Sequence, residues 1–251
     1  MKKNIFRLVF ALPIVFTLSC DVLDDVAGAM LETPGNNTGD AGTVALTNQE
    51  VIGGLKEALT IGIKNAVDVT SVTNGFLENQ NIKLTFPQSA QNMKEKAIEW
   101  GLESQVNNIV VQLNRAAEGA ASEATPIFVN AIKNMTIQDG FQILNGGEGA
   151  ATSFLRKNTE NQLITAFSPK VQEAINEVKL TEYWNPVMTR YNQAMTFIGG
   201  EKVETDLNQY VTERAIDGLF LMVRKEENLI REDPAARVTS ILQRVFGSLG
   251  Q

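Results

Sequence analysis

The chain has 251 residues, of which 43% are hydrophobic and 20% charged, enough for one sizeable core or two small ones. It carries 29 acidic and 22 basic residues, and the resulting net charge of -7 opposes binding to the phosphates of nucleic acids. It contains no histidine and a single cysteine, Cys20, which excludes Ser-His-Asp and Cys-His catalysis, histidine- or cysteine-ligated zinc, and an internal disulfide. These absences leave a carboxylate site for Mg²⁺ or Ca²⁺ open, but the sequence has no Asp-rich loop with the spacing that holds calcium. We expect no metal, no cofactor and no nucleic-acid partner.

The first twenty residues have the pattern of a secretory signal. Three basic residues precede an apolar run over 8–16, which is too short to cross a bilayer as a mature helix. The run ends at Thr17-Leu18-Ser19-Cys20, which resembles the lipobox of bacterial lipoproteins, although the first two residues depart from the usual leucine and small residue. We interpret residues 1–19 as a signal peptide and Cys20 as the lipid attachment site; the alternatives are an ordinary signal peptide or a buried cysteine.

Cleavage before Cys20 would change the charge of the mature chain. It would remove three basic residues and no acidic one, which leaves 19 basic and 29 acidic residues and a net charge of -10. This charge opposes binding to anionic lipid, so the predicted anchor is the acylated cysteine. Asp21 follows the cysteine directly. An aspartate at this position retains lipoproteins in the inner membrane of some bacteria but not of others, so this residue does not decide between the inner and the outer membrane. We expect a lipid-anchored protein of the cell envelope, at the outer membrane and facing the periplasm.

A polar segment separates the predicted anchor from the folded part of the chain. Residues 33–43 collect Pro, Gly, Asn and Asp without an apolar period, so 20–46 is predicted to be a lipidated N-terminus and flexible tether. The folded domain is predicted to cover 47–251. It opens with Thr47-Asn48-Gln49-Glu50, a capping-box pattern that predicts a helix over 49–72.

The next elements are one extended segment and two helices. Residues 82–86 alternate apolar and polar side chains, which predicts a short extended segment without an obvious partner strand. A helix over 88–100 is predicted to end at Gly101. A long helix follows from 104, and Pro126 is predicted to kink or break it.

Two further helix starts have recognisable caps. Thr136-Ile137-Gln138-Asp139 resembles a capping box with aspartate in place of glutamate, and Asn145-Gly146-Gly147 is predicted to end the short helix that it opens. Ser168-Pro169 is typical of an N-cap followed by proline at the first helical position. A separate helix over 169–179 is therefore predicted.

The C-terminal part of the chain supplies the central helix. Residues 215–223 are apolar nearly all round a helix, as in the middle of a helical bundle, and a last helix is predicted over 235–246. These signals together predict an all-α fold. We expect a single multi-helix bundle with at most one short extended segment, near 82–86.

Six short segments are spread in order over residues 47–247. They are Leu55–Leu59 (LKEAL), Asn114–Glu118 (NRAAE), Gly146–Thr152 (GGEGAAT), Tyr210–Thr212 (YVT), Asp217–Phe220 (DGLF) and Pro234–Arg237 (PAAR). Together they resemble a bacterial family known as domain of unknown function 4197. The resemblance implies a signal-bearing envelope protein of helical fold, and it implies no established activity.

Three charged residues lie within predicted helices and need partners or solvent. Arg115 and Glu118 have the spacing of a surface ion pair, which we interpret as a solvated pair; the alternative is a polar cluster that faces a ligand or partner. Asp217 lies in the apolar helix and, if buried, must pair with Arg214 or Arg224.

A glycine-rich turn precedes a predicted helix N-terminus. Such a terminus presents backbone N–H groups and about half a positive charge. The simplest interpretation of the turn is a helix stop, in which glycine supplies positive φ. The functional interpretation is a site for an anionic group of a ligand or partner, bordered by Gly146, Gly147, Thr152 and Arg156, with Arg115 and Glu118 as neighbours across the bundle.

Two functions are compatible with these features. The first is a non-catalytic binding or structural module of the envelope, which binds another envelope component. The alternative is a carboxylate- and arginine-based hydrolase or a protein that binds a small anionic ligand. A cleft in which Arg115, Glu118, Asp139 and Arg156 converge would favour the second function.

Overall fold

The computed structural model describes residues 47–233, 239 and 243–244. The predicted signal peptide, Cys20 and the tether lie outside the described residues. So does the helix predicted over 235–246, apart from three of its residues.

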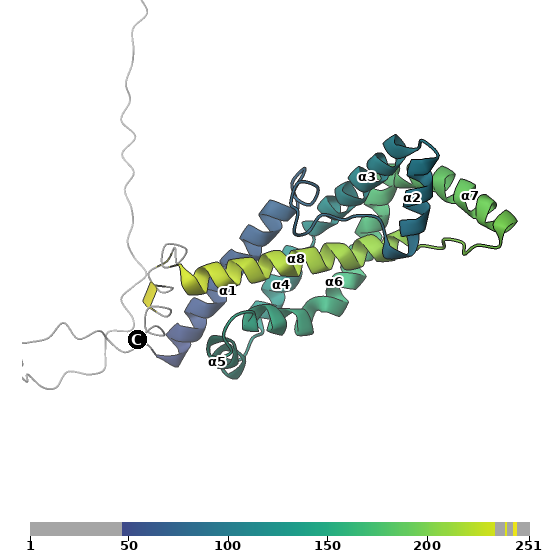
Figure 1. Ribbon diagram of the computed structural model, residues 1–251. Coiled ribbons are helices and arrows are strands. Elements are labelled where there is room, and N and C mark those ends of the chain that lie inside the picture. The colour runs from purple at the N-terminus through teal and green to yellow at the C-terminus, as the bar shows by residue number, and fades with distance from the viewer. Residues whose placement is uncertain (1–46, 234–238, 240–242, 245–251) are drawn as a thin grey trace, which may run out of the picture. The chain divides into compact units, whose positions relative to one another are not determined.

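Residues 47–233 form eight α-helices and one short 3-10 helix, with no strand, which confirms the predicted all-α fold (Figure 1). The described helices pack as one compact unit. They are α1 (Asn48–Thr70), η1 (Gln88–Ala90), α2 (Gln91–Glu99), α3 (Glu103–Ala121), α4 (Ala124–Lys133), α5 (Ile137–Asn145), α6 (Ala150–Glu177), α7 (Leu180–Ile198) and α8 (Leu207–Glu232).

Both predicted capping boxes are present. The hydroxyl of Thr47 accepts a hydrogen bond from the backbone N–H of Glu50, whose carboxylate accepts one from the backbone N–H of Thr47 in return. Thr136 and Asp139 exchange the same two bonds at the start of α5. Each box satisfies N–H groups that the first turn of a helix leaves without intrahelical partners.

The break between α3 and α4 has the predicted cause. Proline lacks an N–H group, and its ring collides with the carbonyl four residues earlier, so it kinks or breaks a helix unless packing offsets the cost. Pro126 lies three residues into α4, and four residues before it is Ser122, where α3 ends. The helix predicted from 104 is therefore two helices.

The separate helix predicted from Ser168-Pro169 is wrong, because α6 runs without interruption through Pro169. Phe167 and Val171, on either side of the proline, are completely buried, so packing against the bundle keeps this part helical. The Ser168 hydroxyl also has another role. It donates to the side-chain oxygen of Asn208 on α8 at 2.8 Å, and the Asn208 amide donates to the Ser168 carbonyl at 2.8 Å.

The helix α7 has no start signal in the sequence. Its N-cap, Lys179, is in the left-handed region and makes no capping side-chain bond, and Pro186 lies inside the helix. The apolar period is nevertheless present, because its buried side chains recur every three or four residues. They are Leu180, Trp184, Val187, Tyr191 and Met195.

The extended segment predicted over 82–86 has the expected alternation but no partner strand. Ile82, Leu84 and Phe86 are buried, while the residues between them are not. A side chain of α3 replaces the strand: Asn114 accepts from the Leu84 N–H and donates to the Leu84 carbonyl, both at 2.8 Å. This amide satisfies the buried backbone, which would otherwise be costly.

The helix α8 is central to the bundle, as the apolar run over 215–223 predicts. It packs against α1, α3 and α6, and Phe220 meets Phe128 of α4 edge to face, with ring centroids 5.4 Å apart. The helix α5 packs against α1 and α6, so α4, α5 and α6 are neighbours on one side. No helix among the described residues is both long and apolar enough to cross a membrane.

Two helical glycines give a matched test of this packing. A β-carbon on Gly218 would lie 2.7 Å from a ring carbon of Phe76 and 3.1 Å from the β-carbon of Ile82, so we expect Gly218→Ala to lower the free energy of unfolding by roughly 1–3 kcal/mol. A β-carbon on Gly53 would have no atom within 4 Å, so Gly53→Ala should raise the free energy of unfolding by about 0.5–1 kcal/mol. Urea unfolding measures both, and equal effects would contradict the close approach.

Candidate functional site

A buried carboxylate fixes the connection between α1 and α2 to α3. Glu118 is only 4% exposed, and its Oε1 accepts hydrogen bonds from the backbone N–H groups of Phe76 and Leu77 at 3.1 and 3.2 Å. Its Oε2 accepts from Arg115 at 2.6 Å, and Arg115 also donates to the Asn74 side chain at 2.5 Å. The prediction of a solvated surface pair is wrong, because residues 74–77 cover this face of α3.

The N-terminus of α6 binds an anion, and that anion belongs to the same chain. The backbone N–H groups of Ala151 and Thr152 donate to the two carboxylate oxygens of Glu227 on α8, at 3.0 and 2.9 Å. The Thr152 hydroxyl donates to Glu227 at 2.8 Å as well. Glu227 is 6% exposed, so its charge is held away from water by these donors and the positive end of the helix.

An arginine completes this network. Arg231 donates to Glu227 Oε1 from Nε at 3.1 Å and from Nη2 at 3.0 Å, and its Nη2 also donates to the carbonyl of Ile143 at 2.9 Å. Ile143 lies in the last turn of α5, and its carbonyl also accepts a long hydrogen bond of 3.4 Å from the backbone N–H of Gly146. The Glu227 and Arg231 side chains therefore attach both α5 and α6 to α8.

The glycines before α6 have separate roles. Gly147 and Gly149 both adopt a φ of 74°, a region that other residues enter at a cost. Gly146 and Gly147 lie in the exposed turn after α5. Gly149 is buried beneath the Arg224 side chain, whose guanidinium carbon would lie 3.2 Å from a β-carbon at this position.

Arg156 belongs to a third set of contacts. Its guanidinium donates to Glu160 at 2.8 Å and to Asp217 on α8 at 3.0 and 3.1 Å, and it lies 4.4 Å from the centre of the Phe220 ring. Asp217 also pairs with Arg214 at 3.0 Å, which confirms one of its two predicted partners. Arg224, the other predicted partner, lies over Gly149 instead.

The residues predicted to border one site thus have separate contacts among the described residues. Arg115 and Glu118 bind residues 74–77, Thr152 binds Glu227, and Arg156 binds Asp217. Among the described residues, no hydrogen bond or ion pair joins one of these sets to another. These charged side chains hold helices and connections in place.

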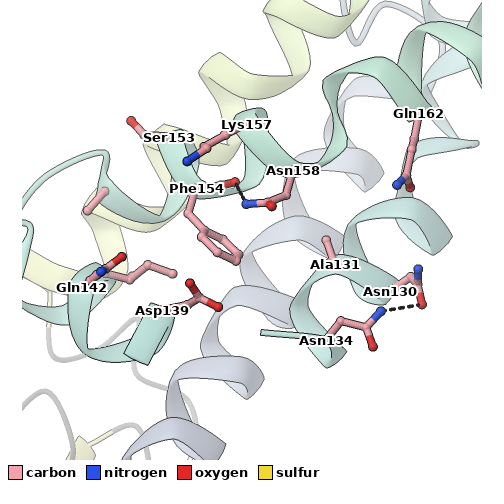
Figure 2. A pocket seen from close by; sticks show the side chains of 12 residues that line it. Asn130, Ala131, Asn134, Asp139, Gln142, Ser153, Phe154, Lys157, Asn158 and Gln162 are labelled. Atoms are coloured by element: carbon pink, nitrogen blue, oxygen red, sulfur yellow. Dashed lines mark hydrogen bonds between the residues drawn. The ribbon is translucent and has the colours of Figure 1, made fainter. Parts of the chain in front are cut away.

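A groove of about 550 Å³ lies between α4, α5 and α6, beside the first turns of α6 (Figure 2). Phe154 lies between its two ends, with Asp139 and Gln142 toward one end and Asn130, Asn134 and Gln162 toward the other. Amides dominate the polar lining. The amide residues are Asn130, Asn134, Gln142, Asn158 and Gln162, and the other polar side chains are Asp139, Ser153 and Lys157.

The two charges in the groove balance each other. Hydrogen bonds from the Thr136 hydroxyl and then from the Thr136 backbone N–H lower the pKa of Asp139 from its ordinary value, and the positive charge of Lys157 lowers it further. Asp139 is therefore ionised at neutral pH, and the lining carries one negative and one positive charge. An ionised Asp139 cannot act as a general acid there.

Sequence reasoning missed most of this groove. Of its lining residues, only Asp139 was expected in a cleft, and its expected companions point elsewhere. The usable signal was the spacing of amides on exposed helix faces. Asn130 on α4 lies one turn before Asn134, the C-cap of that helix, and Asn158 and Gln162 lie one turn apart on α6.

The described residues offer no acidic cluster for a metal. No group of three or more Asp, Glu, Cys or His side chains within the described ranges is placed to hold an ion. The charged groups described above are instead bound to arginines and backbone N–H groups.

Comparison with known proteins identifies the family. Residues 45–247 match the model of a protein family described as protein of unknown function (DUF4197). The chain belongs to DUF4197. No curated protein and no solved structure matches it.

In this DUF4197 chain, several of the segments that carry the resemblance hold the connection between α1 and α2. The segment Asn114–Glu118 binds the backbone of Phe76, Leu77 and Leu84, as described above. Tyr210 donates from its hydroxyl to the Thr85 carbonyl at 2.8 Å. Gly218 allows the Phe76 ring to approach α8. These segments therefore stabilise the position of the connection between α1 and α2.

The Glu227 network makes a testable prediction. Glu227→Ala leaves two α6 N–H groups and Arg231 without their carboxylate, so we expect the free energy of unfolding to fall by about 3–5 kcal/mol. The control is Glu226→Ala, which removes a half-exposed carboxylate that binds Asn65, with an expected change within about 0.5 kcal/mol. Urea unfolding measures both values.

A second measurement checks that the N-terminus of α6 is an anion-binding site that the Glu227 carboxylate occupies. Added phosphate should raise the Tm of Glu227→Ala more than that of the wild type, because the freed N–H groups can bind it. Equal shifts in the two proteins, or equal stability of the two glutamate variants, would contradict the role assigned to Glu227.

Proposed function

We propose that this chain is a lipid-anchored protein of the cell envelope and that its helical domain is a non-catalytic binding module, with the groove between α4, α5 and α6 as its binding site. The observation that carries the proposal is the unused hydrogen-bonding capacity of the groove. Among the described residues, its five amides make only two bonds: Asn134 to Asn130 at 3.4 Å, and Asn158 to the Phe154 carbonyl at 2.7 Å.

The state of the buried carboxylates favours binding over acid–base catalysis. Both oxygens of Glu118 and both of Glu227 accept hydrogen bonds within the fold, so neither carboxylate faces a substrate. In the groove the carboxylate is that of Asp139, which caps α5. A carboxylate-based hydrolase needs an acid and a base or nucleophile beside the reacting bond, and the described groove provides one ionised carboxylate.

The proposed location rests on the N-terminal sequence. A basic start, an apolar run over 8–16 and Cys20 at its end support export and acylation, and the acidic mature chain requires a covalent anchor to stay on an anionic surface. We propose the outer membrane, with the domain in the periplasm. The partner there would be another envelope component.

The anchor is tested by Cys20→Ser, which removes the only thiol available for acylation. We expect the variant to move from the detergent phase to the aqueous phase in a detergent-partitioning assay. Ser19→Ala, which keeps a small residue before the cysteine, should partition like the wild type. A Cys20→Ser protein that stays wholly in the detergent phase would refute the lipid anchor.

The binding site is tested by photocrosslinking in cells. A photoreactive amino acid at Gln142 of the groove should give discrete adducts, whereas the same amino acid at Lys64, an exposed residue of α1 outside the groove, should not. Identical adduct patterns at the two positions would show that the groove is not the binding surface.

A further inference from the structure

We infer that the ligand of the groove is a peptide segment in extended conformation, held mainly through its backbone. The inference rests on the proposed function of the groove as a binding site, and it adds the chemical class of the partner. Four properties of the lining carry it: the chemistry of the amides, their spacing, the length of the groove and its charge balance.

Amide side chains match the peptide group. The side chain of Asn or Gln presents an N–H donor and a C=O acceptor in one plane, and a peptide backbone presents the same two groups. The fold already shows the pairing once, because the Asn114 amide accepts from the N–H of Leu84 and donates to its carbonyl, both at 2.8 Å. Asn114 therefore shows, within this chain, how an amide holds an extended backbone.

The spacing of the groove amides suits a repeating backbone. Asn130 on α4 and Asn134 at its C-cap are four residues apart, as are Asn158 and Gln162 on α6. Four residues advance about 6 Å along a helix, and two residues advance about 6.6 Å along an extended chain. An extended peptide that follows the helices would therefore present equivalent groups to successive amides.

The groove has room for a short segment. Its α6 wall extends from Ala150 to Gln162, which corresponds to about 18 Å of helix. At about 3.3 Å per residue, this length accommodates five extended residues. The apolar residues of the lining are Ala131, Ile143, Ala150 and the half-buried Phe154. Side chains that alternate along the peptide would place small or apolar groups against these residues.

The charge balance of the lining indicates that the peptide does not need a net charge. Asp139 and Lys157 are the charged residues of the lining, and their charges cancel. A neutral peptide therefore meets no net charge in the groove, and strongly charged ligands gain no net attraction. We expect recognition of the backbone with low sequence specificity, as when a peptide binds to the edge of a sheet.

Amides also bind sugar hydroxyls, so a neutral oligosaccharide is the chemical rival. The regular one-turn spacing on two facing helices favours the peptide, because it matches the two-residue repeat of an extended backbone. The ring of Phe154 is half-buried, which limits the flat apolar surface that a sugar ring would need.

The test uses the mature chain with Cys20→Ser, so that it stays unacylated, and follows the backbone and side-chain amide signals by NMR. The first probe is an uncharged hexapeptide of alternating Ala and Ser, acetylated and amidated at its ends. The second is the same peptide with every second backbone nitrogen methylated. The third is chitotetraose, a neutral oligosaccharide.

We expect the first peptide to shift the side-chain amide signals of Asn134, Asn158 and Gln162, and methylation to weaken its binding at least fivefold. Asn158→Ala should weaken it about two- to tenfold, the range for one lost hydrogen bond. The control is Asn176→Ala, an exposed residue on α6 about 27 Å farther along the helix, which should leave binding unchanged.

The outcomes separate the two proposals. If chitotetraose shifts the groove amides and the peptide does not, the groove is a binding site and the peptide inference is wrong. Binding that is insensitive to backbone methylation would also overturn the inference. If none of the three probes moves the groove amides at millimolar concentration, the proposed binding function of the groove fails.

Discussion

The buried carboxylate of Glu227 is the contact on which the arrangement of the site depends. It binds the first turn of α6, and through Arg231 it reaches the last turn of α5. Two of the three walls of the groove are thereby fixed to α8, the central helix. The donors of the α6 N-terminus are satisfied from the core side, so Ser153 and Lys157 of the same turns are left to face the groove. The proposed binding surface lies on the opposite side of α6 from the Glu227 carboxylate that positions this helix.

Local sequence signals predicted much of the fold. Caps at Thr47 and Thr136 and the break before Pro126 follow from bonds and collisions within four residues, which the sequence displays directly. Signals that depend on distant residues were less informative. Ser168 has the composition of an N-cap, but its hydroxyl is taken by Asn208, forty residues later, and burial of the flanking side chains keeps α6 continuous.

The distinction between local signals and distant contacts also explains why the sequence predicted little of the candidate site. The positive N-terminus of α6 was recognised from its glycines, but its anion comes from a residue 75 positions away, which no spacing rule reveals. The Glu118 carboxylate has an ordinary helical neighbour in Arg115, and it is buried only because the chain between α1 and α2 folds over it. The groove amides have no unusual local pattern. They come together only because α4 and α6 pack against each other beside α5.

The extended segment after α1 has a consequence for how the protein behaves among other chains. An alternating apolar segment with an unpaired backbone is a template on which a second chain can add a strand, and such edges promote aggregation. Here three successive carbonyls, those of Leu84, Thr85 and Phe86, each accept a hydrogen bond from a side chain of the bundle. The donors are Asn114, Tyr210 and Gln91. A strand that approached this segment would have to displace these donors. The side-chain hydrogen bonds therefore protect an aggregation-prone segment from pairing with other protein chains.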